Sequence, residues 1–338
     1  MSPPLAGLKV GIIGAGQVAT RGHLPTLRSL GAEVVFLVDL DTAAAQLIAR
    51  ANAIALVLAP KQFLQAQPNC DALLIACPYG ARAPYYQALQ GSNIALMIEK
   101  PVARTERELD LIASLAPEYA IGAGFVRRTW GVLAQLKALI AARSFGALEH
   151  IQINFGSATA IAAGAGFCKS LELAGGGQLF ESAIHNIDAV LHITGCDSFH
   201  VEHCEMEHEA GFDLQTIARL KLCFAHNADV DLSLLVSCFR HTSNDICLQF
   251  EHACLRVSLF DVGAIRVYTR AGIALANLAP LAGQAFVAEP FEAFAQLWTD
   301  FIQGWRAKQC NYTHLSSTRM TTRVIEALYA RAGLERRI

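Results

Sequence analysis

The sequence predicts an α/β domain with a parallel sheet, followed by an α+β domain with an antiparallel sheet. The 338-residue chain is too long for one ordinary core and fits two domains. Apolar strands alternate with segments of helical composition between Leu8 and Pro101, which is typical of a parallel sheet. After Gly146, apolar and polar residues alternate with period two, which favours antiparallel strands with one buried face.

Composition narrows the class of protein. With 53% hydrophobic residues, 17% charged residues and a formal net charge of -2, the chain lacks the basic field of a nucleic-acid-binding protein and the polarity of a disordered one. No apolar run approaches the roughly 20 residues of a membrane span, and the start does not have the pattern of a signal peptide. We therefore expect a cytoplasmic, well-packed protein with no nucleic-acid or membrane partner.

The ten cysteines are spread along the chain without a CxxC pair, and most lie in apolar segments. We expect these cysteines to be reduced and to pack as small hydrophobic residues. The segment "HVEHCEMEH" holds four possible metal donors, but they alternate along an expected strand and would fall on both of its faces. We expect no metal site.

The first strand, turn and helix read "LKVGIIGAGQVATRGHLPTLRSL", with Gly14, Gly16 and Ala19 in a G-x-G-x-x-A pattern. Gly14 would make the tight turn, Gly16 would let the backbone approach a pyrophosphate, and Ala19 would permit close packing of helix on strand. Phosphates would lie at the amino terminus of the helix. Taken alone, the pattern also fits an ordinary turn.

A second apolar strand, "AEVVFLVD", ends in Asp39. A carboxylate at this point can accept hydrogen bonds from both ribose hydroxyls and would repel the 2'-phosphate of NADP. The expected cofactor is therefore NAD, with NADP less favoured. The alternative is that Asp39 only caps the helix that begins near Thr42, a role that Asp41 could fill equally well.

Two more strands, "DALLIAC" and "NIALMIE", alternate with the helical segments "PKQFLQAQ" and "APYYQALQ". Ligands bind beyond the carboxyl ends of such strands, where the loop 77–82 and the sequence Glu99, Lys100, Pro101 lie. This places Lys100 at the cofactor cleft. The residues expected to bind the cofactor are Gly14, Gly16, Gln17, Val18, Asp39, Cys77, Pro78, Tyr79, Glu99 and Lys100.

The segment "AGGGQLFESAIHNIDAVLHITG" predicts a glycine loop that leads into a helix ending at Gly195. Glu181, His185, Asp188 and His192 share one face of that helix. A carboxylate one turn before an imidazole can fix its tautomer and support positive charge, as a general base requires. The alternative is a solvated polar stripe or a core histidine.

Four motifs together resemble the Gfo/Idh/MocA oxidoreductases, which include glucose-fructose oxidoreductase and inositol dehydrogenase: "GIIGAGQVA", "IEKP", "GAGFVRRTW" and "GGGQLFESAIHNIDAVLHITG". The resemblance implies a Rossmann domain over 1–120 and a domain for substrate binding and oligomerisation, with an open antiparallel sheet, over 121–338. It also implies a Lys-Pro bond that is often cis, and a homodimer or homotetramer.

The resemblance further implies an NAD-dependent dehydrogenase that transfers hydride between nicotinamide and a hydroxyl-bearing carbon of a sugar, cyclitol or related polyol. Lys100, His185 and Glu181 would be catalytic. Substrate would be bound by Lys100, Arg128, Asp188 and His185.

The chain departs from the family pattern at Glu181, where many relatives have aspartate, at Ala183, where many have glycine, and at Arg82, where a histidine is frequent. These changes affect the expected substrate more than the expected reaction. Two alternatives stay open: a reductase of imines or conjugated systems, and a catalytically silent NAD-binding regulator. If His185 is not the base, Tyr79 or His192 is the next candidate.

The carboxyl-terminal half adds strands within "ALEHIQINFG", "TIARLKLCFAH", "ADVDLSLLVSC", "DICLQFEH", "CLRVSLF" and "AIRVYTR", and two closing helices. Trp298 and Trp305, seven residues apart, predict a core stripe on the first of these helices. The outer face of the sheet is expected to be apolar and covered by a partner subunit. Four residues suggest this: Ile217, Leu220, Leu232 and Leu234.

Overall fold

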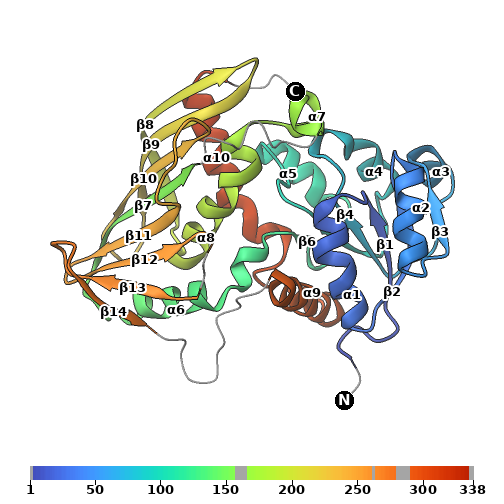
Figure 1. Cartoon of the computed structure of the whole chain (residues 1–338), viewed down its shortest axis with the longest axis horizontal. Coiled ribbons are helices and arrows are strands. Elements are labelled where there is room, and N and C mark those ends of the chain that lie inside the picture. Colours follow the sequence, from blue (N-terminus) through green and yellow to red (C-terminus); the bar gives the residue numbers. More distant parts are fainter. Residues whose placement is uncertain (1–2, 157–165, 261–262, 279–289, 335–338) are drawn as a thin grey trace. The chain divides into compact units, whose positions relative to one another are not determined.

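The computed structural model describes residues 3–156, 166–260, 263–278 and 290–334, which form two compact units (Figure 1). The first unit comprises Met1–Ala103, Arg107–Val126 and Glu289–Arg319. The second comprises Arg104–Glu106, Arg127–Ala288 and Met320–Ile338.

A six-stranded parallel sheet forms the centre of the first unit, with the strand order β3-β2-β1-β4-β5-β6. Its strands β4 and β5 are fully buried apolar runs, because helices cover both faces. The predicted parallel sheet is confirmed. The strands are β1 (Lys9–Ile13), β2 (Glu33–Val38), β3 (Leu56–Leu58), β4 (Ala72–Ile75), β5 (Ala95–Ile98) and β6 (Ile121–Ala123).

Short helical segments connect these strands. A π-helical turn, η1 (Val18–His23), continues into α1, and single 3-10 turns precede α4 and β6. The α-helices of the unit are α1 (Leu24–Ser29), α2 (Thr42–Ala51), α3 (Pro60–Gln65), α4 (Ala83–Ala88), α5 (Glu106–Ala113) and α9 (Pro290–Ala307). The 3-10 turns are η2 (Tyr79–Ala81), η3 (Glu118–Ala120) and η7 (Leu315–Thr318).

Helix α9 is part of the first unit, although the boundary expected at residue 120 assigns it to the second domain. Its residues Leu297, Trp298 and Phe301 are 1%, 0% and 0% exposed and lie in the same core as Leu27 of α1 and Ile12 of β1. The predicted core position of Trp298 is confirmed. On the opposite face of the sheet, a separate set of rings packs together, in which Phe36, Phe63 and Tyr85 are neighbours.

An eight-stranded sheet forms the second unit, in the order β14-β13-β12-β11-β7-β10-β9-β8. Its neighbouring strands are antiparallel except for β7 and β10, so the sheet is mixed rather than purely antiparallel. The strands are β7 (Leu148–Gly156), β8 (Ser198–Glu209), β9 (Phe212–Cys223), β10 (Val230–Ser237), β11 (Asp245–Phe250), β12 (Cys254–Ser258), β13 (Ile265–Tyr268) and β14 (Ala274–Leu278).

Helices of the second unit include two that carry functional candidates, α8 and the π-helical turn η6 before it. Helix α6 packs on α8, and Tyr329 of α10 reaches Asp213 of β9. The helical segments are η4 (Val126–Thr129), α6 (Gly131–Ala141), η5 (Gly166–Lys169), α7 (Leu171–Ala174), η6 (Leu179–Ala183), α8 (Ile184–Thr194) and α10 (Arg319–Arg331).

The expected apolar outer face of this sheet is wrong in most of its residues. Leu220, Leu232 and Leu234 are 1%, 2% and 3% exposed, so they point into the core, and only Ile217 is exposed, at 36%. The outward positions of the central strands are mostly polar; they include Gln152, Asn154, Arg219 and Ser233. Period-two alternation showed which residues share a face, but both faces of β9 and β10 contain leucine or isoleucine, so it did not show which face is inside.

Candidate active site

The glycine loop after β1 has the geometry that a dinucleotide needs. Gly14 has φ +94°, and a Cβ there would lie 2.5 Å from the backbone nitrogen of Cys77, so only glycine fits. At Gly16 a Cβ would meet no atom within 4 Å, which leaves room for a phosphate to approach the backbone. Gly16, Gln17 and Val18 are exposed where the loop enters η1. The loop therefore fits NAD.

Asp39, at the end of β2, contacts this loop directly. Its Oδ2 accepts a hydrogen bond from the Ala15 backbone N–H at 2.7 Å, and its Oδ1 accepts one from the Asp41 N–H at 2.9 Å. Asp41 itself caps α2 by accepting from the Ala44 N–H. The capping alternative for Asp39 is therefore wrong, and its half-buried carboxylate fits the role of ribose acceptor.

Arg82 joins the loop after β4 to the turn that carries Lys100. Its side chain is buried, with 3% of the residue exposed, and Nη1 donates to the carbonyl oxygens of Glu99 at 2.7 Å and Pro101 at 2.6 Å. Its Nε donates to the Cys77 carbonyl oxygen at 3.0 Å. Lys100, which stands between Glu99 and Pro101 in the sequence, is half-buried. The Lys100–Pro101 bond is cis, as the resemblance implies. The arginine at this departure from the family pattern thus binds backbone around the lysine.

The Glu99 carboxylate is held from the other side by a buried histidine. Trp298 Nε1 donates to His23 Nδ1 at 2.9 Å, and His23 Nε2 lies 2.8 Å from Glu99 Oε1. Because an indole N–H can only donate, Nδ1 carries no proton and Nε2 donates to the carboxylate. Glu99 Oε2 also accepts from the Lys100 backbone N–H at 3.0 Å. Sequence reasoning missed His23, whose only signal was a histidine at the end of the "QVATRGH" segment.

Other predicted residues of this region already have partners in the first unit. Tyr79 donates its hydroxyl to both carboxylate oxygens of Glu108, at 2.5 Å each, which disfavours it as a base. Pro78 precedes the η2 turn. Cys77 is buried, and this burial raises the pKa of its thiol. The cofactor roles of these residues stay predictions.

In the second unit, Asp213 of β9 anchors the "GGG" segment. Its Oδ1 and Oδ2 accept hydrogen bonds from the N–H groups of Gly177 at 2.6 Å and Leu179 at 2.5 Å, and Tyr329 donates its hydroxyl to it. A Cβ at Gly177 would lie 2.1 Å from the Asp213 carbonyl oxygen, which accounts for glycine there. Burial raises the pKa of Asp213. No sequence pattern indicated this anchor.

The predicted helix with the histidine is confirmed, and a π-helical turn, a feature frequent at functional sites, precedes it. Glu181 and His185 are half-buried on this segment, and Glu181 Oε2 accepts from the Ser182 hydroxyl at 2.5 Å. The expected contact between Glu181 and His185 stays a prediction. Burial, with Arg128 and Lys137 nearby, lowers the pKa of His192 to about 4, so it would be a weak base at neutral pH.

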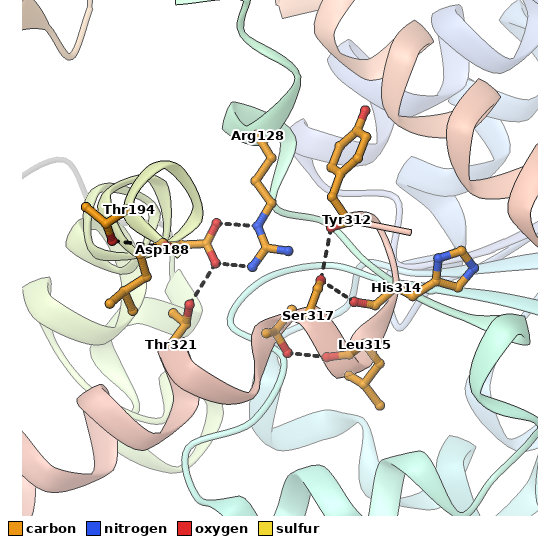
Figure 2. A network of polar contacts seen from close by, with 10 residues as sticks. Arg128, Asp188, Thr194, Tyr312, His314, Leu315, Ser317 and Thr321 are labelled. Atoms are coloured by element: carbon orange, nitrogen blue, oxygen red, sulfur yellow. Dashed lines mark hydrogen bonds and ion pairs between the residues drawn. The ribbon is translucent and has the colours of Figure 1, made fainter. Parts of the chain in front are cut away.

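Arg128 and Asp188 form a buried ion pair, with 7% and 1% of each residue exposed. Figure 2 shows the two groups facing each other: Nε donates to Oδ2 at 2.7 Å and Nη2 to Oδ1 at 2.5 Å. Thr321 of α10 donates to the same Oδ1 at 2.8 Å. Both residues were expected to bind substrate. Each has a partner within the second unit, and a substrate contact by either stays a prediction.

Within residues 3–156, 166–260, 263–278 and 290–334, no helix has both the length and the apolar character needed to cross a membrane.

Comparisons with known proteins agree with this geometry. Residues 8–120 match the model of the Gfo/Idh/MocA family, described as an oxidoreductase family with an NAD-binding Rossmann fold. Over 196 residues, the chain is 27% identical to a putative UDP-kanosamine synthase oxidoreductase subunit of Amycolatopsis mediterranei, covering 57% of this chain and 53% of that protein. It is 28% identical over 196 residues to inositol 2-dehydrogenase of Pseudarthrobacter chlorophenolicus, covering 56% and 54%. The chain thus spans about half the length of these curated relatives.

The fold is shared over nearly the whole chain with a levoglucosan dehydrogenase solved in complex with NADH and L-sorbose. The TM-score is 0.80 at 15% identity, covering 97% of each chain. Residues 8–120 thus match the NAD-binding Rossmann domain of the Gfo/Idh/MocA oxidoreductases, and the chain as a whole shares the fold of a levoglucosan dehydrogenase.

Proposed function

We propose that this protein is an NAD-dependent dehydrogenase acting on a hydroxyl-bearing carbon of a sugar, cyclitol or related polyol. The observation that carries the proposal is the support of Lys100: Arg82 binds the carbonyl groups on both sides of it, and Glu99 binds its backbone N–H. This turn lies in the same unit as the open glycine loop and the Asp39 carboxylate. NAD, when held by these residues, supplies the hydride acceptor or donor of the reaction.

Lys100 would act on the reacting oxygen. A fixed positive charge stabilises negative charge that develops on a substrate oxygen. It does so without reorganisation when the backbone that carries it is rigid. The buried contacts of Arg82 and Glu99 hold the backbone of the lysine turn rather than its side chain. We propose that the ammonium group acts on the substrate oxygen.

His185 would take the proton of the substrate hydroxyl during oxidation and return it during reduction. The start of its helical segment is held by the buried Asp213 contacts to Gly177 and Leu179, which supports a well-defined position for its backbone. We propose that Glu181 orients the ring and supports its charged form. In the same way, Arg128 and Asp188 would support the helix from within, whether or not either touches substrate.

Two similar proteins support the reaction class. One curated relative is an inositol 2-dehydrogenase, and one protein of the same fold was solved with NADH and L-sorbose. The experiment is to incubate the purified protein with NAD and a panel of sugars, cyclitols, polyols and sugar acids, and to follow NADH together with product mass. The proposal is supported if members of one class lose two hydrogens while NADH forms. If the protein binds NAD and oxidises no member, but reduces imines with NADH, the reductase alternative replaces it.

We further propose a homodimer or homotetramer assembled through the sheet of the second unit, in the cytoplasm. The edge strand β14 is exposed along most of its length, and Leu275 on it and Ile273 beside it are 60% and 65% exposed. Edge strands with apolar side chains favour pairing with another chain. Light scattering at micromolar concentration tests the proposal, and a monomeric mass would refute it.

A further inference from the structure

Two consecutive arginines in η4 differ in the charge of their partners. Arg128 is neutralised by the bidentate contact with Asp188. Arg127 meets an uncharged partner instead, because its Nη1 donates to the side-chain oxygen of Asn186, two residues before Asp188 on α8. Among the residues that the structure describes, no carboxylate forms an ion pair with Arg127.

The charge of Arg127 is also poorly solvated. The side chain is half-buried, and its guanidinium carbon lies 4.9 Å from the centre of the Trp130 ring. Desolvation lowers the pKa of the guanidinium to about 10, which still leaves it charged at neutral pH. A stacked guanidinium keeps its N–H edge available for a planar acceptor in its own plane.

Asn186 supplies a second, independent sign of a missing acceptor. It is 0% exposed, and its Nδ2 has no hydrogen-bond partner in the described part of the chain. The amide orientation follows from Arg127, which can only donate and therefore requires the amide oxygen. Buried amide N–H groups are rarely left without an acceptor, since this costs the desolvation of the group.

The atoms that remain on Arg127 and Asn186 are all donors. A hydroxyl group would use them only as an acceptor, whereas a carboxylate matches both the donor set and the single positive charge. A phosphate carries nearly two negative charges, which one guanidinium would not balance. Asn186 and the proposed base His185 are both on α8.

We propose that Arg127 and Asn186 bind a carboxylate of the substrate, so that the enzyme acts on a sugar acid in preference to the neutral polyol. This inference rests on the proposed function and names its substrate class.

The test uses matched pairs that differ in one carboxylate: D-gluconate with D-glucitol, D-galactonate with D-galactitol, and D-glucuronate with D-glucose. Binding to the intact protein is measured by calorimetry without cofactor, and kcat/KM is measured with NAD. For at least one pair, we expect the affinity and kcat/KM of the acid to exceed those of the neutral compound by roughly 10- to 100-fold. This is the usual effect of hydrogen bonds to a charged group.

Two variants should abolish that preference by different routes. Arg127→Gln removes the charge, and Asn186→Asp supplies an internal carboxylate that neutralises it. Lys137→Gln is the control, because it removes an exposed positive charge of the same unit without touching either residue. It should keep the preference.

Equal binding of acid and neutral partner in every pair would overturn the inference. So would a preference for glucose 6-phosphate over glucuronate, or a loss of NAD affinity in Arg127→Gln with the acid preference intact. If no compound reduces NAD, the proposed function fails, while the calorimetric comparison still decides the carboxylate site.

Discussion

His23 donates a hydrogen bond of 2.8 Å to Glu99, and so connects the turn after the glycine loop to the turn that carries Lys100. The imidazole is held in the required tautomer by Trp298, which lies 275 residues further along the chain. All three side chains are buried. Helix α9 therefore supports the lysine turn as well as covering the sheet.

Trp298→Phe should test this connection. The change removes the indole N–H and leaves His23 Nδ1 buried without its donor, which costs about 1–3 kcal/mol of the free energy of unfolding, in addition to lost packing. Urea denaturation measures it. Trp305→Phe, on the same helix but only partly buried, is the matched control and should cost clearly less. Equal losses would mean that the hydrogen bond contributes nothing.

Asp39→Asn should weaken the preference for NAD over NADP. The wild-type protein should favour NAD by at least about tenfold, because the carboxylate accepts from the ribose and repels a 2'-phosphate. The asparagine keeps one acceptor oxygen for the loop and removes the charge. Fluorescence titration with NADH and NADPH measures both affinities. A wild-type preference for NADPH would contradict the assignment.

Asp188→Asn should destabilise the protein by about 3–5 kcal/mol, because it leaves the Arg128 cation buried without its counter-charge. The exposed pair between Arg319 and Asp110 provides the comparison, with side chains 43% and 63% exposed. Asp110→Asn should cost about 0–1 kcal/mol. Chemical denaturation of both variants gives the difference. Similar values for the two would show that the Arg128 pair does not behave as a buried one.

Stability should fall with acidification through His192. The pKa of this side chain is 6.5 in the unfolded reference and about 4 in the folded protein. Between these values the unfolded state binds the proton and the folded state does not, so the free energy of unfolding decreases as pH falls from 6.5 to about 4. Below the lower value this contribution is constant. His192→Gln should flatten the dependence of the urea midpoint on pH in that window, and an unchanged slope would refute the assignment.

Local patterns predicted much of the fold and part of the site. Gly14, Asp39 and Lys100 could be placed because a glycine pattern and the ends of parallel strands fix positions along the chain. The contact between His23 and Trp298 could not, since it joins segments with no shared periodicity. The sequence pattern showed that Asp188 lies on the charged face of α8. Its partner Arg128 lies on another element, so the sequence could not distinguish an ion pair between the two from substrate binding by each.

We propose that Lys100 and His185 carry out NAD-dependent oxidation of a substrate hydroxyl. The most direct measurement compares NADH formation by wild type, Lys100→Ala and His185→Ala on the best substrate of the panel, alongside NAD titration of each. We predict that both variants bind NAD as wild type does and that His185→Ala loses roughly 100- to 10,000-fold in turnover, the usual effect of removing a general base. Lys100→Ala should likewise lose far more turnover than NAD affinity. Near-normal turnover by either variant would contradict these roles for Lys100 and His185.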